Sequence, residues 1–167
     1  MVNLFFLHNS KSREKTTLGG IMEKKEMMLA NRIYQDCGVG MLAIDKILKK
    51  IQNEPLKKLF TKQFEMYEKF ANKCDIFAVN NDFEIKDNGF FKKAKQTTML
   101  YMMLWMDKSP RHIVEMMING TVMGIVDTIK AQKDLKSKNE ELNLMVEEFK
   151  KMQEDFYEKL KKQLAKV

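Results

Sequence analysis

Three aspartates are the residues of this chain best placed for metal chemistry. Asp36, Asp45 and Asp127 each fall near the apolar side of an expected helix. Carboxylates that point into a helical bundle can hold two iron or manganese ions, and two of the helices then also supply a Glu-x-x-His pair. The sequence has no such pair, because its two histidines, His8 and His112, do not follow a glutamate by three residues. We therefore expect no metal site, no cofactor and no catalytic residue, and the aspartates remain the ligands to test.

Two glutamines take the central places that metal-binding carboxylates would need. Gln63 and Gln153 lie on the apolar sides of their expected helices, and an amide is a poor ligand for a hard divalent cation. The acidic residues of the same helices fall on the outer side: Glu65, Glu68, Glu147, Glu148, Glu154, Asp155 and Glu158. We expect Gln63 and Gln153 to hydrogen-bond each other or nearby groups at the centre of a bundle.

The cysteines and methionines indicate core packing rather than catalysis. Cys37 and Cys74 are the only cysteines, and no Cys-x-x-Cys or Cys/His cluster is present, which argues against a zinc site. Both lie on apolar helical stripes, where a free thiol behaves as a small buried apolar group. The chain has fifteen methionines, and those at 22, 27, 28 and 99–106 sit at helical spacings that suit core filling. No phosphate-binding loop, dinucleotide fingerprint or nucleophile elbow occurs.

Helical periodicity must position these residues, and no strand pattern is present. Apolar residues recur at three- and four-residue steps over about 22–52, 54–79, 89–106, 109–136 and 137–164. Ser109 followed by Pro110 is a typical helix start, Asn53 is the expected cap of the second helix, and Ser137 with Glu140 forms a capping-box pattern. The helix after Ser109 is apolar on nearly every side, so we expect neighbours to cover it on both sides.

Three glycines inside the expected helices indicate close packing. Glycine in the middle of a helix costs about 1 kcal/mol relative to alanine. Gly120 and Gly124 share one face of the fourth helix, and Gly40 lies on the stripe of the first. We interpret them as a place where the backbones of these two helices approach each other.

Composition bounds the domain organisation and the partners. The 167 residues suit one domain, which we place at 22–167. Residues 1–21 do not resemble the rest, and we interpret them as a non-native or disordered leader ahead of a start at Met22.

The net charge is +7, but 27 of the 30 basic residues are lysine, whereas specific nucleic-acid surfaces favour arginine. Charges interrupt the apolar runs too often for a membrane span. We expect a cytoplasmic protein.

Two hairpins of similar pattern carry a resemblance to a known family. The chain resembles an uncharacterised bacterial ferritin-like family, a domain of unknown function, through Gly40–Phe70, Thr98–Met106 and, above all, His112–Asp127. The resemblance implies an all-α, up-down bundle of four helices (22–52, 54–79, 109–136 and 137–164) with a shorter helix, 89–106, in the crossover. It implies no activity.

The methionine-rich helix in the crossover suggests where a partner would bind. Its outer side carries Met99, Met102, Met103, Trp105 and Met106, and such surfaces adapt to partners. We expect a homodimer through this helix and the helix 109–136. The preferred interpretation is a non-enzymatic structural or interaction protein. A metal-dependent oxidase or storage protein on the same bundle, and a weak polyanion binder, are the alternatives.

Overall fold

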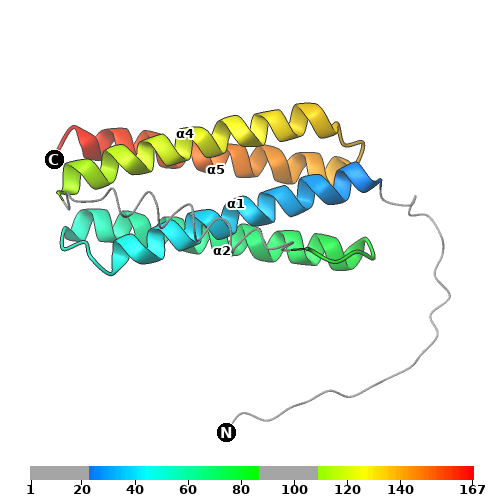
Figure 1. The fold of residues 1–167 in the computed structure, drawn as a ribbon, viewed down its shortest axis with the longest axis horizontal. Helices are drawn as coiled ribbons and strands as arrows, with labels where there is room; N and C mark the ends of the chain where they lie inside the picture. Colours follow the sequence, from blue (N-terminus) through cyan, green and yellow to red (C-terminus); the bar gives the residue numbers. More distant parts are fainter. Residues whose placement is uncertain (1–22, 87–108) are drawn as a thin grey trace, which may run out of the picture.

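The computed structural model describes residues 23–86 and 109–167, and this part of the chain forms four helices and no strand. The helices are α1 (Lys24–Leu48), α2 (Glu54–Asn80), α4 (Pro110–Leu135) and α5 (Glu140–Leu164) (Figure 1). The prediction of an all-α bundle is confirmed for these residues. The leader 1–21, and the helix 89–106 with Met99, Met102, Met103, Trp105 and Met106, lie outside the described residues.

Local side-chain caps set the helix starts. Asn53 Oδ1 accepts a hydrogen bond from Leu56 N at 3.0 Å, and Ser109 Oγ accepts one from His112 N at 3.3 Å, as predicted. The start of α5 differs from the prediction, because its cap is Asn139 rather than Ser137. The Ser137 hydroxyl instead donates to a carboxylate of α1.

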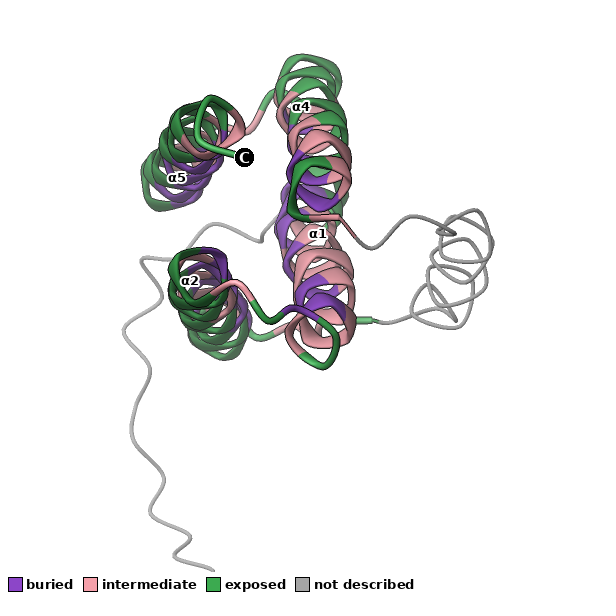
Figure 2. Ribbon diagram, turned by 90° about the vertical axis from the view of Figure 1, so that its left-hand side faces the viewer, coloured by how far each residue is buried: buried purple, intermediate pink, exposed green. Residues whose placement is uncertain are grey.

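The four helices form two antiparallel hairpins that pack against each other. α1 pairs with α2 and α4 with α5, while α1 lies against α4 and α2 against α5 (Figures 1 and 2). Near its start α1 touches the α4–α5 turn, so α1 and α4 run in opposite directions. It follows that α2 and α4 run in the same direction, and that Asn80 and Pro110 lie at opposite ends of the bundle. The chain between them must cover that length, about 39 Å for a 26-residue helix.

The core lies between the hairpins and is built around phenyl rings. Phe149 of α5 stands 5.4 Å, centroid to centroid, from Phe70 of α2, and Phe60 and Phe156 are 6.3 Å apart in an edge-to-face arrangement. Buried residues of all four helices face this interior in the end-on view of Figure 2. Edge-to-face contacts add about 0.5–1.5 kcal/mol each to the burial of the rings.

Among residues 23–86 and 109–167, other helices cover only one of the two sides of α4 that were expected to be covered. Its inner side is buried through Ile113, Val114 and Met117. Its outer side is exposed, although it is apolar, through Val122, Met123, Val126 and Ile129. Among the described residues, no helix is both long enough and apolar enough to cross a membrane.

A buried carboxylate ties the first turn of α1 to the turn between α4 and α5. Glu26 is only 7% exposed, and its Oε1 accepts hydrogen bonds from Ser137 Oγ at 3.0 Å, Lys138 N at 3.1 Å and Asn139 N at 2.9 Å. Its other oxygen accepts from Glu23 N at 3.1 Å. Burial raises the pKa of Glu26, but these hydrogen bonds outweigh burial and leave the pKa below its ordinary value.

Replacing Glu26 by alanine should therefore destabilise the bundle by about 2–4 kcal/mol, because a hydroxyl and several partly buried N–H groups lose a charged acceptor. The exposed Glu65 provides the matched control, Glu65→Ala, which should change stability by less than about 0.5 kcal/mol. Because the pKa of Glu26 is lowered in the folded state, its carboxylate stabilises the fold at pH values above the ordinary pKa of 4.5. This contribution is lost as the pH falls below that value. Urea unfolding of wild type and Glu26→Ala at neutral and acidic pH measures both effects. Equal losses for the two variants would contradict the assignment.

Candidate functional site: a buried polar cluster

The two predicted central glutamines are buried and lie in the interior of the bundle. Gln63 on α2 is 5% exposed and Gln153 on α5 is 3% exposed. Gln63 Nε2 donates to the thioether sulfur of Met152 at 2.7 Å. Gln153 Oε1 lies 3.3 Å from the hydroxyl of Thr128 on α4, which also lies 2.9 Å from the Gly124 carbonyl oxygen. Each amide thus has a hydrogen-bond partner on a neighbouring helix, as expected.

Tyr67 connects the two glutamines, and the sequence did not single it out as a polar residue. It lies one turn after Gln63 on α2, is 5% exposed, and makes side-chain hydrogen bonds with both Gln63 and Gln153. Burial is the main reason that its pKa lies well above the ordinary value for a phenol, and the nearby Cys37 and Asp36 add to the rise. Tyr67 therefore stays protonated at neutral pH and cannot serve there as a base. We call Gln63, Tyr67, Thr128 and Gln153 the polar cluster.

Two of the three predicted glycines make room for the polar cluster. A Cβ added to Gly40 would lie 2.4 Å from Cε2 of the Tyr67 ring, and one added to Gly124 would lie 2.8 Å from Gln153 Nε2. α1 and α4 do lie against each other, but these two glycines accommodate side chains of α2 and α5 rather than the backbone of the other helix, so the predicted reason for them is wrong. The prediction also fails at Gly120, where an added Cβ would meet nothing within 4 Å.

Two of the three candidate metal ligands share an arginine instead. Arg32 Nε lies 3.1 Å from Asp36 Oδ1, and Arg32 Nη2 lies 3.0 Å from Asp127 Oδ2, so the guanidinium bridges α1 and α4. The side chain of Asp36 is 12% exposed and that of Asp127 is 45% exposed. Burial raises the pKa of Asp36 to about 6; Asp127 adds to the rise and Arg32 opposes it.

The third candidate ligand does not join the other two. Asp45 is half exposed and forms an ion pair with Lys49, one turn further along α1. Within residues 23–86 and 109–167, no group of three or more histidine, cysteine, aspartate or glutamate side chains is arranged to hold a metal ion. The acidic residues predicted to face outward are all exposed: Glu65, Glu68, Glu147, Glu148, Glu154, Asp155 and Glu158.

The two cysteines are buried and free, as predicted. Both thiols have no exposed surface. Burial is the main reason that the pKa of Cys37 lies well above its ordinary value and that the pKa of Cys74 is raised to about 12. A nucleophilic cysteine needs a thiolate, so neither side chain suits that role at neutral pH.

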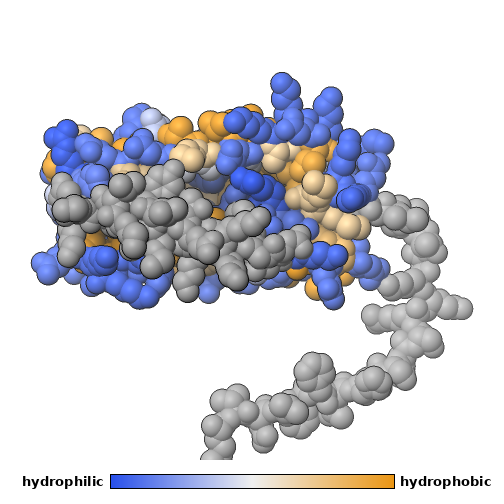
Figure 3. Space-filling model, in the orientation of Figure 1, coloured by the Kyte–Doolittle hydropathy of each residue, from blue (hydrophilic) through white to orange (hydrophobic). Residues whose placement is uncertain are grey.

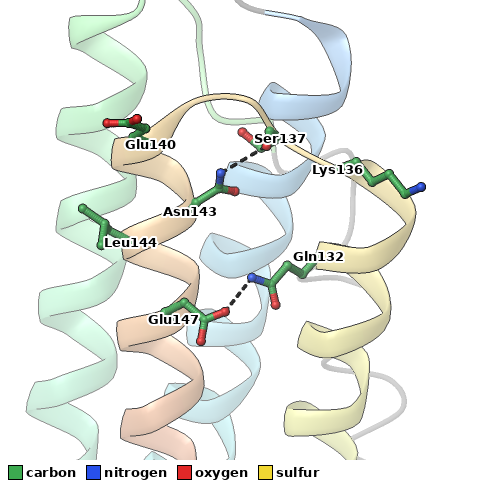
Figure 4. A pocket seen from close by; sticks show the side chains of 7 residues that line it. All are labelled: Gln132, Lys136, Ser137, Glu140, Asn143, Leu144 and Glu147. Carbon is green, nitrogen blue, oxygen red and sulfur yellow. Dashed lines mark hydrogen bonds between the residues drawn. The ribbon is translucent and has the colours of Figure 1, made fainter.

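Two open depressions on the described part of the surface lie beside turns between helices. One, of about 580 Å³, lies beside the α4–α5 turn, where Gln132 Nε2 donates to Glu147 Oε1 at 2.7 Å and Asn143 Nδ2 donates to Ser137 O at 3.1 Å (Figure 4). The other, of about 770 Å³, lies between the start of α1 and the segment that follows α2, Asp82–Lys86. The polar side chains in Figure 4 are paired with each other, pair with Glu26 in the case of Ser137, or point to solvent, which suits a solvated turn.

Comparisons with protein-family models, with curated proteins and with solved structures gave no match. The geometry of the polar cluster and the surface of the bundle are the features that bear on function.

Substituting the glycines tests the packing around the polar cluster. Gly40→Ala should destabilise the fold by about 1–3 kcal/mol, because the new methyl group overlaps the Tyr67 ring. Gly120→Ala is the matched control and should stabilise by up to about 1 kcal/mol, since it gains helix propensity in open space. Thermal and urea unfolding of both variants measure this difference. A stabilising Gly40→Ala would show that Tyr67 does not pack there.

The raised pKa of Asp36 gives a second, pH-dependent test. A folded-state pKa of about 6, above the ordinary 3.8, contributes stability that is fully present below pH 3.8 and is lost as the pH rises through 6. Between pH 4 and pH 7.5, the free energy of unfolding of the wild type should therefore fall by on the order of 2 kcal/mol relative to that of Asp36→Asn. Urea unfolding at several pH values measures the difference, and parallel curves for the two proteins would refute the raised pKa.

Proposed function

We propose that this chain is a ferritin-like bundle that works as a non-enzymatic structural and interaction protein. The course of the chain supports the ferritin-like part. Two antiparallel hairpins are joined by a connection that must run the length of the bundle, because α2 and α4 are parallel. A single long crossover between two hairpins is the arrangement of ferritin-like folds.

The chemistry of the polar cluster is the observation that carries the non-enzymatic part. The central positions hold two amides, a phenol and a hydroxyl, and each of these groups is hydrogen-bonded within the cluster or to an adjacent group. A dinuclear centre for hard dications needs carboxylates and imidazoles there. Asp36, the most buried candidate ligand, already pairs with Arg32, and a guanidinium beside it repels a cation.

In this proposal the polar cluster has a structural task. Gln63 and Tyr67 belong to the first hairpin, while Thr128 and Gln153 belong to the second. Hydrogen bonds between the two sets fix how far one hairpin is displaced along the other, because a shifted pairing would leave buried amides without partners. The result is a stable rod with defined surfaces, which is what a scaffold for protein contacts requires.

Metal loading of the full chain tests the proposal against the oxidase or storage alternative. After incubation with Fe²⁺ or Mn²⁺ and desalting, we expect well below one metal ion per chain and an unchanged thermal midpoint, since a tightly bound ligand would raise it. Tyr67→Phe should lower the midpoint without altering metal content. Two tightly held ions per chain, with a raised midpoint, would overturn the proposal.

A further inference from the structure

The outer face of α4 carries several exposed apolar side chains on successive turns. Val122 and Val126 are each 41% exposed, Ile129 is 46% exposed and Met123 is 59% exposed. Apolar surface gathers along the upper edge of Figure 3, over the position of α4 in Figure 1. Single exposed apolar residues are ordinary, whereas several on successive turns of one helix form an apolar patch that a partner could cover.

The spacing of residues on this face is that of a helix–helix seam. Steps of four, three, four, three and four residues connect the members of the seam: Glu115, Asn119, Val122, Val126, Ile129 and Lys133. Alternating steps of three and four keep side chains on one narrow stripe that a second helix can cover. The bundle itself uses other sides of α4, where Asp127 meets Arg32 of α1 and Thr128 meets Gln153 of α5.

The charges at the two ends of the seam select the direction of a partner helix. Glu115 lies at the start and the exposed Lys133 at the end, at equal distances from Gly124. Glu115 is 43% exposed and is paired with Arg111 on its own helix, so it keeps exposed surface for a second cation. An identical helix that runs antiparallel brings Lys133 beside Glu115 at both ends. A parallel copy would instead place like charges together, which is unfavourable.

We infer that the seam on α4 is the interface of a homodimer, in which a second copy of this chain packs antiparallel about a two-fold axis level with Gly124. This inference rests on the proposed function, because it names the partner of the interaction surface. The two-fold axis sets Val122 beside Val126 of the second copy and Ile129 beside its Asn119. The seam is about 27 Å long, so the interface is small and the dimer should dissociate on dilution.

Sedimentation velocity of the full chain over a micromolar to sub-millimolar range tests the dimer. We expect a concentration-dependent shift from monomer to dimer that Val126→Glu weakens by at least about tenfold. Ile76→Glu is the matched control, because Ile76 is an exposed apolar residue on α2, at 60%; it should leave the dimer unchanged. Circular dichroism checks that both variants fold. A chain that stays monomeric, or equal weakening by both variants, would overturn the inference.

Cysteine cross-linking tests the antiparallel direction. Glu115→Cys and Lys133→Cys each place one exposed thiol at an end of the seam, while Cys37 and Cys74 are buried. In the antiparallel dimer either variant alone should cross-link poorly, and an equal mixture should cross-link efficiently. Efficient cross-linking of each variant with itself would refute the antiparallel arrangement. Failure here leaves the metal-loading result of the proposed function unaffected, so the two proposals can fail separately.

Discussion

The requirement that buried polar groups find partners determines how the two hairpins meet. Apolar side chains tolerate small shifts of one helix along another, whereas a buried amide or carboxylate does not. The bundle satisfies this requirement at two levels: the polar cluster lies inside the bundle, and Glu26 lies at one end. At each level the hydrogen bonds connect the first hairpin to the second. The relative position of the hairpins is thus set by polar contacts, and the rings of the core fill the space that those contacts leave.

The same contacts restrict the chemistry that the interior can perform. Burial keeps the phenol of Tyr67 and the thiols of Cys37 and Cys74 protonated, and Asp36 forms an ion pair with Arg32. General acid–base or nucleophilic catalysis needs groups that change protonation near neutral pH and that substrate can reach. Among these buried side chains of the described helices, Asp36 has a pKa, about 6, that lies near that range. These properties of the interior are those of groups that stabilise a fold.

The sequence predicted the elements well because helix signals are local. Apolar periodicity and the caps at Asn53 and Ser109 placed three helix starts within two residues of those observed. The inward position of Gln63 and Gln153 also followed from periodicity. The contacts between elements did not, since they depend on the displacement between hairpins. That is why Gly40 and Gly124 were assigned to a backbone approach rather than to Tyr67 and Gln153, and why Arg32 was not foreseen as a bridge.

The two buried thiols have a consequence for following the motions of this protein. Because Cys37 and Cys74 have no exposed surface, a thiol reagent reaches them only when the chain around them opens. Their labelling rate then reports how often the first hairpin separates from its surroundings, in the manner of amide hydrogen exchange. Cys37 lies on α1 and Cys74 on α2, so a difference between their rates would show which helix detaches first. The two native cysteines can thus be used to measure local opening of the first hairpin.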